Sequence, residues 1–393
     1  MKKSGIIANA FFILISAISV SCLTEAPLKI PFQSFTPLNL GDGWEIADPA
    51  SVGIDGEALK DVYRYVHDEN NVWQIRSLLV FRNNKLVAES YMKDRNDITN
   101  LHPVWSCTKQ VIGILAGIAV DKNLISVNDT ISDHFSQITD SHEKSKITIE
   151  NLLMMMSGIN YNNDGYFGED SKLARQEPSN SLNFVLGLGM HSSVGTQYRY
   201  KNSDPHIISA VIQERVGKTT RDWAQEVLFD KIGISRLQWR TYKDGITFGG
   251  FGILTTPREM GKIGQLVANG GIWNGEQIVS NDWIDVMTSA KVPADEVNYY
   301  DLAFGYMWWK EISRNVNIAI GHGGQYIIVN KDKNLTVVIT SERHTSGDHF
   351  LSVNSALSIF DRIKNTLQED YVHRFREGCP LFSVPFSSHF LCS

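Results

Sequence analysis

Short runs of apolar residues typical of β-strands lie near both ends of the chain. Residues 76–81 are such a run and residues 85–91 alternate, on either side of the turn pair Asn83-Asn84, so together they predict a β-hairpin. Four further runs near the other end have the same character, and a turn at 332–334 joins the last two. They are residues 304–310, 316–320, 326–330 and 335–340.

Between these runs the apolar residues recur with the period of a helix. Leu59, Val62, Tyr63 and Val66 predict an amphipathic helix that opens at 55–57 and reaches about residue 68. Residues 107–124 are apolar on most sides, which is typical of a central, buried helix. Further helical patterns cover residues 148–158, 206–216, 221–228, 257–268 and 352–367.

Strands therefore bracket a helical middle, and this order predicts an α+β fold. We expect an antiparallel β-sheet flanked by helices, with an inserted all-helical lobe at about 107–245, inside one domain that spans 51–368. Ligand sites tend to lie in the cleft between two such units. The predicted site is thus the seam between sheet and lobe.

The composition excludes several classes of protein and of binding partner. The 393 residues are 42% hydrophobic and 20% charged, which is ordinary globular usage and excludes a disordered or collagen-like chain. The net charge is −6 because 43 Asp and Glu outnumber 37 Lys and Arg, so nucleic acid is not an expected partner. The sequence contains no HExxH or CxxC motif and its eleven His are scattered, so we expect neither a metal site nor a cofactor.

The N-terminus has the pattern of an export signal. Lys2 and Lys3 precede an apolar run over 6–20, which is short for a membrane span, and we assign 1–22 as a signal peptide. The run ends in small residues before Cys22, as in bacterial lipoproteins that are lipidated at this Cys, although Ser19 stands where that pattern prefers Leu, Val or Ile. Ordinary secretion and an uncleaved anchor are the alternatives. We expect an exported bacterial protein, periplasmic or anchored to the membrane by a lipid.

Two segments outside the predicted domain carry little periodicity. Residues 23–50 hold four prolines and predict an extended arm. Residues 369–393 form a C-terminal tail with Cys379 and Cys392, between which an exported protein permits a disulfide, and the sequence leaves this pairing open. Cys107, inside the apolar helix, predicts a buried and unreactive thiol.

The strongest chemical signal is Ser106 followed by Lys109 at the head of the buried helix. Residues three apart share a helix face, so the hydroxyl and the amine would lie within reach of each other. A serine needs a base to become a nucleophile, and burial in an apolar lobe favours the neutral lysine that can act as one. The motif is weak alone: Ser141 and Lys144 match it too, and the alternative is an N-cap serine beside a solvated lysine.

Two further groups fit the same chemistry. In Tyr200-Lys201-Asn202 a phenol that can move a proton stands two residues from an amide that can hold Lys109 and a substrate; an ordinary polar turn is the alternative. In His322-Gly323-Gly324, ahead of a predicted strand, the glycines let a substrate approach the backbone closely; a plain β-turn is the alternative.

Taken in order, these motifs resemble the serine β-lactamase and penicillin-binding-protein family. The similarity is greater to its class C-like branch, which includes carboxylesterases, D-aminopeptidases and 6-aminohexanoate-dimer hydrolases. It runs from about residue 50 to 365. The matching segments are Trp105-Ser106-Cys107-Thr108-Lys109, 147–153 with Ser157-Gly158, Tyr200-Lys201-Asn202, 249–253 with 255–257, 305–309 and His322-Gly323-Gly324.

The resemblance implies a role for each matching residue. Ser106 would be the acylated nucleophile, Lys109 its proton acceptor, and Tyr200 the general acid or base that also activates the deacylating water. Asn202 would orient Lys109 and the substrate. These four residues would form the reacting centre.

The same resemblance implies the surroundings of that centre. The backbone N–H groups of Ser106 and Gln325 would form the oxyanion hole, His322, Gly323 and Gly324 would contact the substrate, and Trp105 would wall the cleft. Family members that act on β-lactams or D,D-peptides usually carry Lys-Thr-Gly where His322-Gly323-Gly324 stands. A neutral His meets a substrate carboxylate poorly, which favours an uncharged ester or amide.

The sequence thus supports three functions. The first is an exported serine hydrolase of esterase or amidase type that forms an acyl-enzyme on Ser106 with a small-molecule substrate. The second is a β-lactamase or D,D-peptidase acting on peptidoglycan-type substrates. The third is a catalytically silent ligand-binding lipoprotein, against which the joint presence of Ser106, Lys109 and Tyr200 argues. An α/β-hydrolase is disfavoured because no GxSxG occurs. The natural substrate and the oligomeric state are not evident from the sequence.

Overall fold

The computed structural model describes residues 29–138, 143–164, 167–342 and 350–368. The predicted signal peptide with Cys22, and the C-terminal tail with Cys379 and Cys392, lie outside the described residues. Of the part that is described, no helix is both long and apolar enough to cross a membrane.

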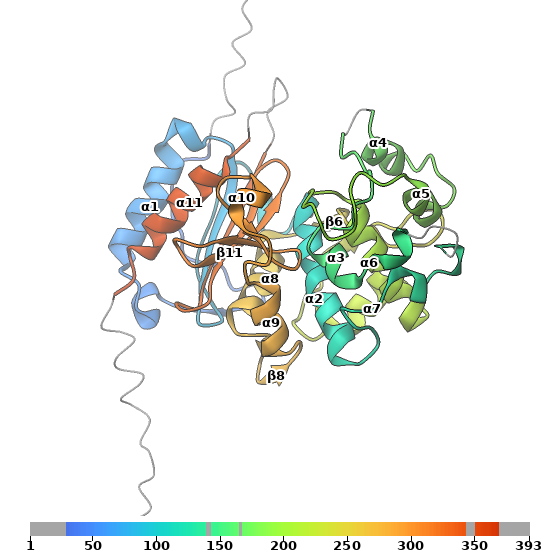
Figure 1. The fold of residues 1–393 in the computed structure, drawn as a ribbon. Coiled ribbons are helices and arrows are strands. Elements are labelled where there is room, and N and C mark those ends of the chain that lie inside the picture. Colours follow the sequence, from blue (N-terminus) through green and yellow to red (C-terminus); the bar gives the residue numbers. More distant parts are fainter. Residues whose placement is uncertain (1–28, 139–142, 165–166, 343–349, 369–393) are drawn as a thin grey trace, which may run out of the picture.

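An eight-stranded sheet forms the first half of the molecule (Figure 1). Its strand order is β1-β3-β2-β13-β12-β11-β10-β9, so the N-terminal hairpin and the C-terminal strands form one sheet, as predicted, in which β2 pairs with β13. Neighbours are antiparallel except β1 and β3, which pair in parallel. The strands are β1 (Glu45–Ile46), β2 (Ile75–Arg82), β3 (Lys85–Tyr91), β9 (Ala303–Phe304), β10 (Trp309–Glu311), β11 (Val316–Gly321), β12 (Gln325–Asn330) and β13 (Leu335–Ser341).

Helices cover both faces of this sheet (Figure 1). Helices α1 (Gly56–Asp68) and α11 (Val353–Lys364) lie together on the outer face. Helix α8 (Pro257–Ala268) lies on the inner face. It approaches closely because two glycines face the sheet: a Cβ at Gly261 would lie 2.2 Å from the Phe81 ring, and one at Gly264 would lie 2.4 Å from Thr336.

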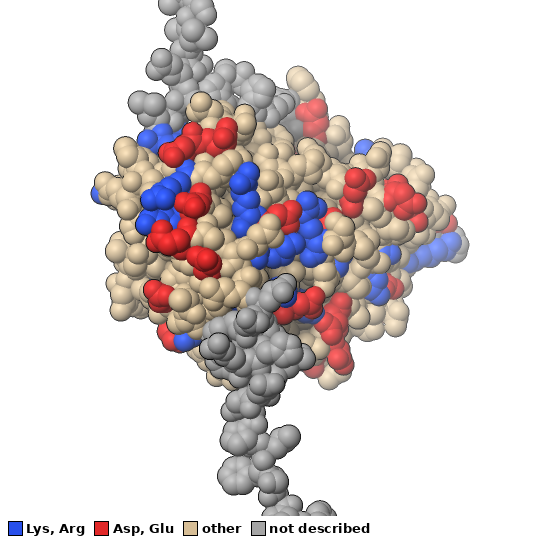
Figure 2. Space-filling view, turned by 90° about the vertical axis from the view of Figure 1, so that its left-hand side faces the viewer, with Lys and Arg blue, Asp and Glu red and all other residues tan. Residues whose placement is uncertain are grey.

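Side chains of both charges are interspersed on the outer surface that carries α1 and α11 (Figure 2). Several form ion pairs along or between these helices and their neighbours, including Lys60 with Glu57, Arg64 with Asp61, and Arg314 with Asp361.

The second half of the molecule is the lobe, built around α2 (Thr108–Asp121). This helix is buried along nearly its whole length, as its apolar sequence predicts, and it packs against α6 (Ser203–Val216). A Cβ at Gly117 would lie 2.2 Å from the Trp283 ring, so the glycine lets α9 (Asn281–Met287) pack on α2. The other helices are α3 (Ile149–Leu153), α4 (Glu169–Ala174), α5 (Ser181–Gly187), α7 (Thr220–Ala224), α9 (Asn281–Met287) and α10 (Ala294–Val297).

The lobe is not entirely helical, which differs from the expectation. A small three-stranded sheet closes its base, where the chain enters and leaves the lobe. Its strands, in spatial order, are β4 (His102–Pro103), β6 (Ile253–Thr255) and β5 (Leu237–Trp239); β7 (Ile272–Trp273) and β8 (Glu276–Gln277) form a separate hairpin. These strands are only two or three residues long, too short for a period-two pattern to reveal them.

The predicted strand over 304–310 is wrong in one respect. It is broken into β9 and β10 by a bend at 305–308, in which Met307 adopts the left-handed φ of 64°. The Met307 N–H donates to the Leu153 carbonyl, and the Gln110 amide donates to the Met307 carbonyl at 2.5 Å. The bend therefore joins the sheet to the lobe, and these tertiary hydrogen bonds override the local strand propensity.

Residues 29–50, in the range expected to form an extended arm, run along β3 and include β1, the edge strand of the sheet. The Ile30 N–H donates to the Met92 carbonyl and the Glu89 N–H to the Phe35 carbonyl. Arg258 of α8 forms ion pairs with Glu89 at 2.6 Å and with Asp42 of the arm at 2.9 Å. The arm thus covers a sheet edge that would otherwise expose unpaired backbone groups.

Candidate active site

A strained turn presents Ser106 at the seam between sheet and lobe. Residues 105–107 form a single 3-10 turn that leads into α2, and Trp105 within it has a φ of 50°. A bulky residue in this left-handed region is rare and persists only where the surrounding fold enforces it. The turn leaves the Ser106 hydroxyl partly exposed while Cys107 and the rest of the helix are buried.

The Lys109 amine lies one helical turn below, and its Nζ is 3.0 Å from the Ser106 Oγ. Two more acceptors surround it: the Gly250 carbonyl at 2.6 Å and the Asn202 Oδ1. A protonated amine would donate to all three, whereas a neutral amine has only two N–H groups and one lone pair. With both N–H groups directed at Gly250 and Asn202, the lone pair faces the Ser106 hydroxyl.

Burial changes the basicity of this amine. Lys109 is completely buried, and desolvation lowers its pKa from 10.5 to about 7, against the opposing influence of the Asp170 and Cys107 charges. The neutral form is thus accessible near neutral pH, as the apolar sequence around Lys109 predicts.

Gly250 explains how a backbone carbonyl comes so close to the amine. A Cβ at this position would lie 2.7 Å from the Asn202 Oδ1, closer than real Cβ contacts allow. Its neighbour Gly249 is equally crowded, since a Cβ there would lie 2.0 Å from the Pro205 carbonyl oxygen. The glycine-rich stretch therefore packs its backbone directly against the start of α6.

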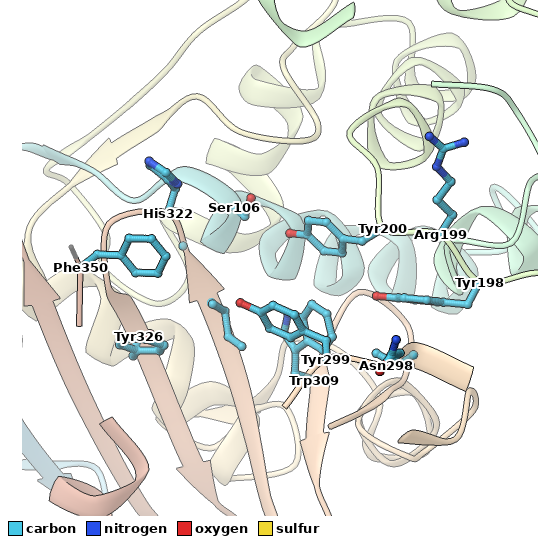
Figure 3. Close-up of a pocket in the computed structure, with 13 residues that line it drawn as sticks. Ser106, Tyr198, Arg199, Tyr200, Asn298, Tyr299, Trp309, His322, Tyr326 and Phe350 are labelled. Atoms are coloured by element: carbon cyan, nitrogen blue, oxygen red, sulfur yellow. The ribbon is translucent and has the colours of Figure 1, made fainter. Parts of the chain in front are cut away.

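Tyr200 approaches Ser106 from the lobe side, with its hydroxyl pointing toward the serine (Figure 3). Its ring lies over the Lys109 Nζ at 4.8 Å and stacks on Trp309 with the centroids 5.5 Å apart. Desolvation raises the pKa of the phenol, while the hydrogen bond with Ser106 opposes that rise. Burial therefore favours the neutral form of both groups: an unprotonated amine at Lys109 and a protonated phenol at Tyr200.

Three residues that sequence reasoning missed support this group: Tyr161 and Asn163 from the segment before α4, and Asp170 from its first turn. Asp170 accepts from the Asn202 amide at 2.6 Å and from the Tyr161 hydroxyl at 2.5 Å. The Asn163 side chain accepts from the Asn202 N–H at 3.0 Å and donates to the Tyr200 carbonyl at 2.7 Å. No sequence motif marks these residues, because the segment has no periodicity and meets Asn202 only through the tertiary fold.

A cavity of about 460 Å³ opens in front of Ser106 (Figure 3). Its size is in the range of small-molecule sites, and its walls are largely aromatic or aliphatic. The lining residues are Ser106, Tyr198, Arg199, Tyr200, Val297, Asn298, Tyr299, Trp309, Ile320, Gly321, His322, Tyr326 and Phe350.

The other predicted substrate contacts are not all at this cavity. His322 lines it, and Trp105, 42% exposed, packs edge-on against His322 at the rim with the ring centroids 5.7 Å apart. Gly323 and Gly324 form the hairpin turn between β11 and β12 with left-handed φ values of 81° and 88°. Neither glycine lines the cavity, so it is the conformation of the turn that requires glycine at these two positions.

Gln325 also lies away from the cavity. It pairs with Gly321 at the start of β12, its amide donates to the Ser341 carbonyl at 2.8 Å, and its own carbonyl accepts from the Cys107 thiol at 3.5 Å. Instead, Ile320 and Gly321 of β11 line the cavity beside Ser106. A Cβ at Gly321 would lie 2.2 Å from the Val104 carbonyl oxygen, so this strand end touches the turn that carries the nucleophile.

Cys107 is a buried, free thiol whose pKa is raised by desolvation, which agrees with the predicted structural role. Within the described ranges, no cluster of three or more His, Cys, Asp or Glu is arranged to hold a metal ion. The groups at the site are those of acid–base and nucleophilic chemistry.

Known proteins share this fold and part of the sequence. The chain is 20% identical over 269 residues to the 6-aminohexanoate-dimer hydrolase of Paenarthrobacter ureafaciens, which covers 63% of this chain and 68% of that protein. Among solved structures, a family VIII carboxylesterase superposes with a TM-score of 0.65 at 16% identity, over 82% of this chain and 99% of the other. The D-alanine carboxypeptidase AmpC from Burkholderia cenocepacia gives 0.59 at 13% identity, over 79% and 99%.

At these identities the superpositions establish the shared fold. The family itself follows from the sequence, because the beta-lactamase family model matches residues 76–357, which is more than half of the chain. The match includes Ser106, Lys109, Tyr200 and the strand β11 that faces them. The chain therefore belongs to the beta-lactamase family of serine hydrolases.

Proposed function

We propose that this protein hydrolyses a small, uncharged ester or amide through an acyl-enzyme on Ser106. The observation that carries the proposal is the hydrogen-bond geometry of Lys109, whose two fixed acceptors leave the third position of the amine for the Ser106 hydroxyl. A serine with such a neighbour is an activated nucleophile.

In this mechanism Lys109 accepts the Ser106 proton as Oγ attacks the substrate carbonyl. Desolvation of the amine supports this role, since a base works best with a pKa near the working pH. The resulting ammonium ion is stabilised by the acceptors already around it, Asn202 Oδ1 and the Gly250 carbonyl.

Tyr200 then supplies the proton that the leaving alcohol or amine requires. Its raised pKa supports a proton donor rather than a standing phenolate base. Return of the proton from Lys109 to Tyr200 restores both groups. In deacylation the same pair removes a proton from water, which attacks the acyl carbonyl, and returns that proton to the Ser106 Oγ as the acid leaves.

The oxyanion hole in this proposal uses Ile320 rather than Gln325. The ladder between β10 and β11 ends at the pair Trp309–Ile318, and alternate residues of an antiparallel strand direct their N–H groups to the same edge. Ile320 lies two residues beyond the last pair and lines the cavity, so this proposal assigns its N–H to the cavity. Together with the Ser106 N–H, it can donate to the oxygen of the tetrahedral intermediate.

The cavity walls support a substrate with an apolar or aromatic acyl group. Trp309, Tyr326 and Phe350 present rings from the sheet side, and Ile320 presents an aliphatic side chain beside Ser106. His322 stands where family members that act on β-lactams usually carry the lysine of Lys-Thr-Gly. Its ring contacts Trp105 and Phe350. A carboxylate-bearing β-lactam or D,D-peptide would have no lysine there to meet it.

A test is to treat the protein with a fluorophosphonate probe and with p-nitrophenyl esters of increasing acyl size. We expect stoichiometric labelling at Ser106 by intact mass, ester turnover, and loss of both in Ser106→Ala but not in the exposed control Ser235→Ala. Absence of labelling and of turnover from pH 6 to 9 would instead support a silent binding protein. Faster turnover of a chromogenic cephalosporin than of any ester would support the β-lactamase alternative.

We further propose that the protein is exported and anchored by a lipid at Cys22. Support comes from the sequence alone: the two N-terminal lysines, the apolar run over 6–20 and the small residues before Cys22. Metabolic labelling with an alkyne fatty acid should mark the wild type but not Cys22→Ser. An unlabelled, fully secreted wild type would contradict lipidation but not export.

A further inference from the structure

The orientation of one amide decides how Lys109 can meet Ser106. Asn202 directs its Oδ1 to the Lys109 Nζ and its Nδ2 away from it. The reverse orientation would place an N–H donor against the amine, where it would compete for the lone pair that the serine proton requires. Something in the structure must therefore keep the oxygen end of this amide on Lys109.

Asp170 supplies that constraint. An ionised carboxylate can only accept hydrogen bonds, and Asp170 accepts one from the Asn202 Nδ2 at 2.6 Å. We propose that Asp170 is a positioning residue, which fixes the Asn202 amide with its oxygen toward Lys109 and so aims the amine at Ser106. This inference rests on the proposed function of Ser106 and Lys109 and adds a residue that acts only through Asn202.

The surrounding contacts hold Asp170 itself in place. The Tyr161 hydroxyl donates to its other oxygen at 2.5 Å, which leaves the first oxygen to Asn202. Asn163, from the same segment, holds the backbone of both Asn202 and Tyr200. The segment before α4 and the first turn of that helix are thus tied to both ends of the Tyr200–Asn202 motif.

Asp170 is not among the residues that line the cavity, so it is not placed to touch a substrate. It nevertheless acts on Lys109 electrostatically. Its charge raises the pKa of Lys109, as does the Cys107 thiol, while desolvation lowers it. Asp170 in turn faces Lys109, Tyr161, Asn202 and Glu169, and desolvation raises its own pKa.

The first variant is Asp170→Asn, which keeps the shape but replaces the acceptor-only carboxylate with a group that can face either end of Asn202. We measure the rate of Ser106 labelling by the fluorophosphonate from pH 5 to 10, and kcat and KM for an ester. The plateau rate should fall about 10- to 100-fold with KM nearly unchanged, because proton transfer contributes about that much or more. The midpoint of the acid limb should move to lower pH, because Lys109 loses a nearby negative charge.

The matched control is Glu169→Gln, at the neighbouring acidic residue, whose carboxylate accepts from the Asn162 N–H while Asn202 keeps its contact with Asp170. Its plateau rate should stay within about threefold of the wild type, since the amide remains fixed. A loss as large as that of Asp170→Asn would show that packing of the segment, rather than orientation of the amide, controls the rate.

A double-mutant cycle separates positioning from a general structural role. In an Asn202→Ala background the amide is gone, so adding Asp170→Asn should change the plateau rate by less than about threefold. If the two losses multiply instead, Asp170 acts independently of Asn202 and the proposal is overturned. Should Asp170→Asn fail to fold, Asp170→Ala completes the same cycle with the same expectation.

The two proposals fail in different ways. A wild type that is not labelled at Ser106 contradicts the proposed function. A wild type that is labelled, with an Asp170→Asn variant of unchanged plateau and unchanged acid limb, leaves the hydrolase intact and contradicts only the role of Asp170.

Discussion

The two walls of the cleft differ in kind. On the lobe side, Lys109, Asn202 and Asp170 form a chain of hydrogen bonds in which each polar group has a defined partner. On the sheet side, Trp309, Tyr326 and Phe350 present rings to the same cavity. Polar groups with fixed partners are pre-organised for proton transfer, whereas apolar walls exclude water and select by shape.

The two walls of the cleft depend on each other. Tyr200 of the lobe stacks on Trp309 of the sheet, and the enclosure of Lys109 lowers its pKa to about 7. The sheet wall thus helps provide the low-dielectric surroundings that make the lobe wall reactive. Substitutions in the lobe wall should change kcat, and substitutions in the sheet wall should mainly change KM and acyl-chain selectivity.

The largest effect is expected for Lys109→Met, which keeps the volume of the side chain and removes the base. We expect kcat/KM for a p-nitrophenyl ester to fall about 10³- to 10⁴-fold while circular dichroism stays native. The control is Lys262→Met on α8, another fully buried lysine, which forms an ion pair with Glu259 at 2.9 Å. It should lower the melting temperature and leave kcat unchanged; equal kcat losses in both would contradict the division between walls.

A smaller effect, about 100-fold on kcat, is expected for Gly250→Ala. The new Cβ would lie 2.7 Å from the Asn202 Oδ1, so the amide or the Gly250 carbonyl must move away from Lys109. Gly189→Ala is the control in the same lobe, because nothing lies within 4 Å of its Cβ position. Steady-state kinetics measure the change in kcat. A fully active Gly250→Ala variant would show that the Lys109 acceptors are not needed in these positions.

The smallest effect is expected on the sheet side, for Phe350→Ala. Loss of one ring should raise KM about tenfold for an aromatic ester, with little change in kcat and little change for an acetyl ester. Phe184→Ala, a half-buried ring in α5 outside the cavity, should leave KM unaltered. A fall in kcat alone for Phe350→Ala would contradict the prediction that the sheet wall mainly affects KM.

The sequence predicted those parts of the site that depend on local periodicity. Ser106 and Lys109 are three apart on a helix, so their contact follows from helix geometry once the helix is recognised. The motif Tyr200-Lys201-Asn202 was found because phenol and amide lie close in sequence. The hairpin at 75–91 and helices α1, α2 and α8 were likewise evident from apolar spacing and turn residues.

The rest depended on contacts between distant segments. Asp170 lies 32 positions from Asn202, in a segment with no periodic pattern, and no local rule connects them. Gln325 was chosen for the oxyanion hole because it follows two glycines, but the hairpin turn places Ile320 and Gly321 at the cavity instead. The break at Met307 arose from hydrogen bonds to α2 and to the end of α3.

By itself the sequence determined which side chains can perform the chemistry and which elements carry them, because helix and strand periods are local properties of the backbone. Only the tertiary structure decided the state of those side chains. Whether the amine of residue 109 is neutral, which end of the amide at residue 202 it meets, and which strand faces the serine all depend on burial and on partners more than ninety residues away. Desolvation and hydrogen-bond geometry are properties of the assembled fold.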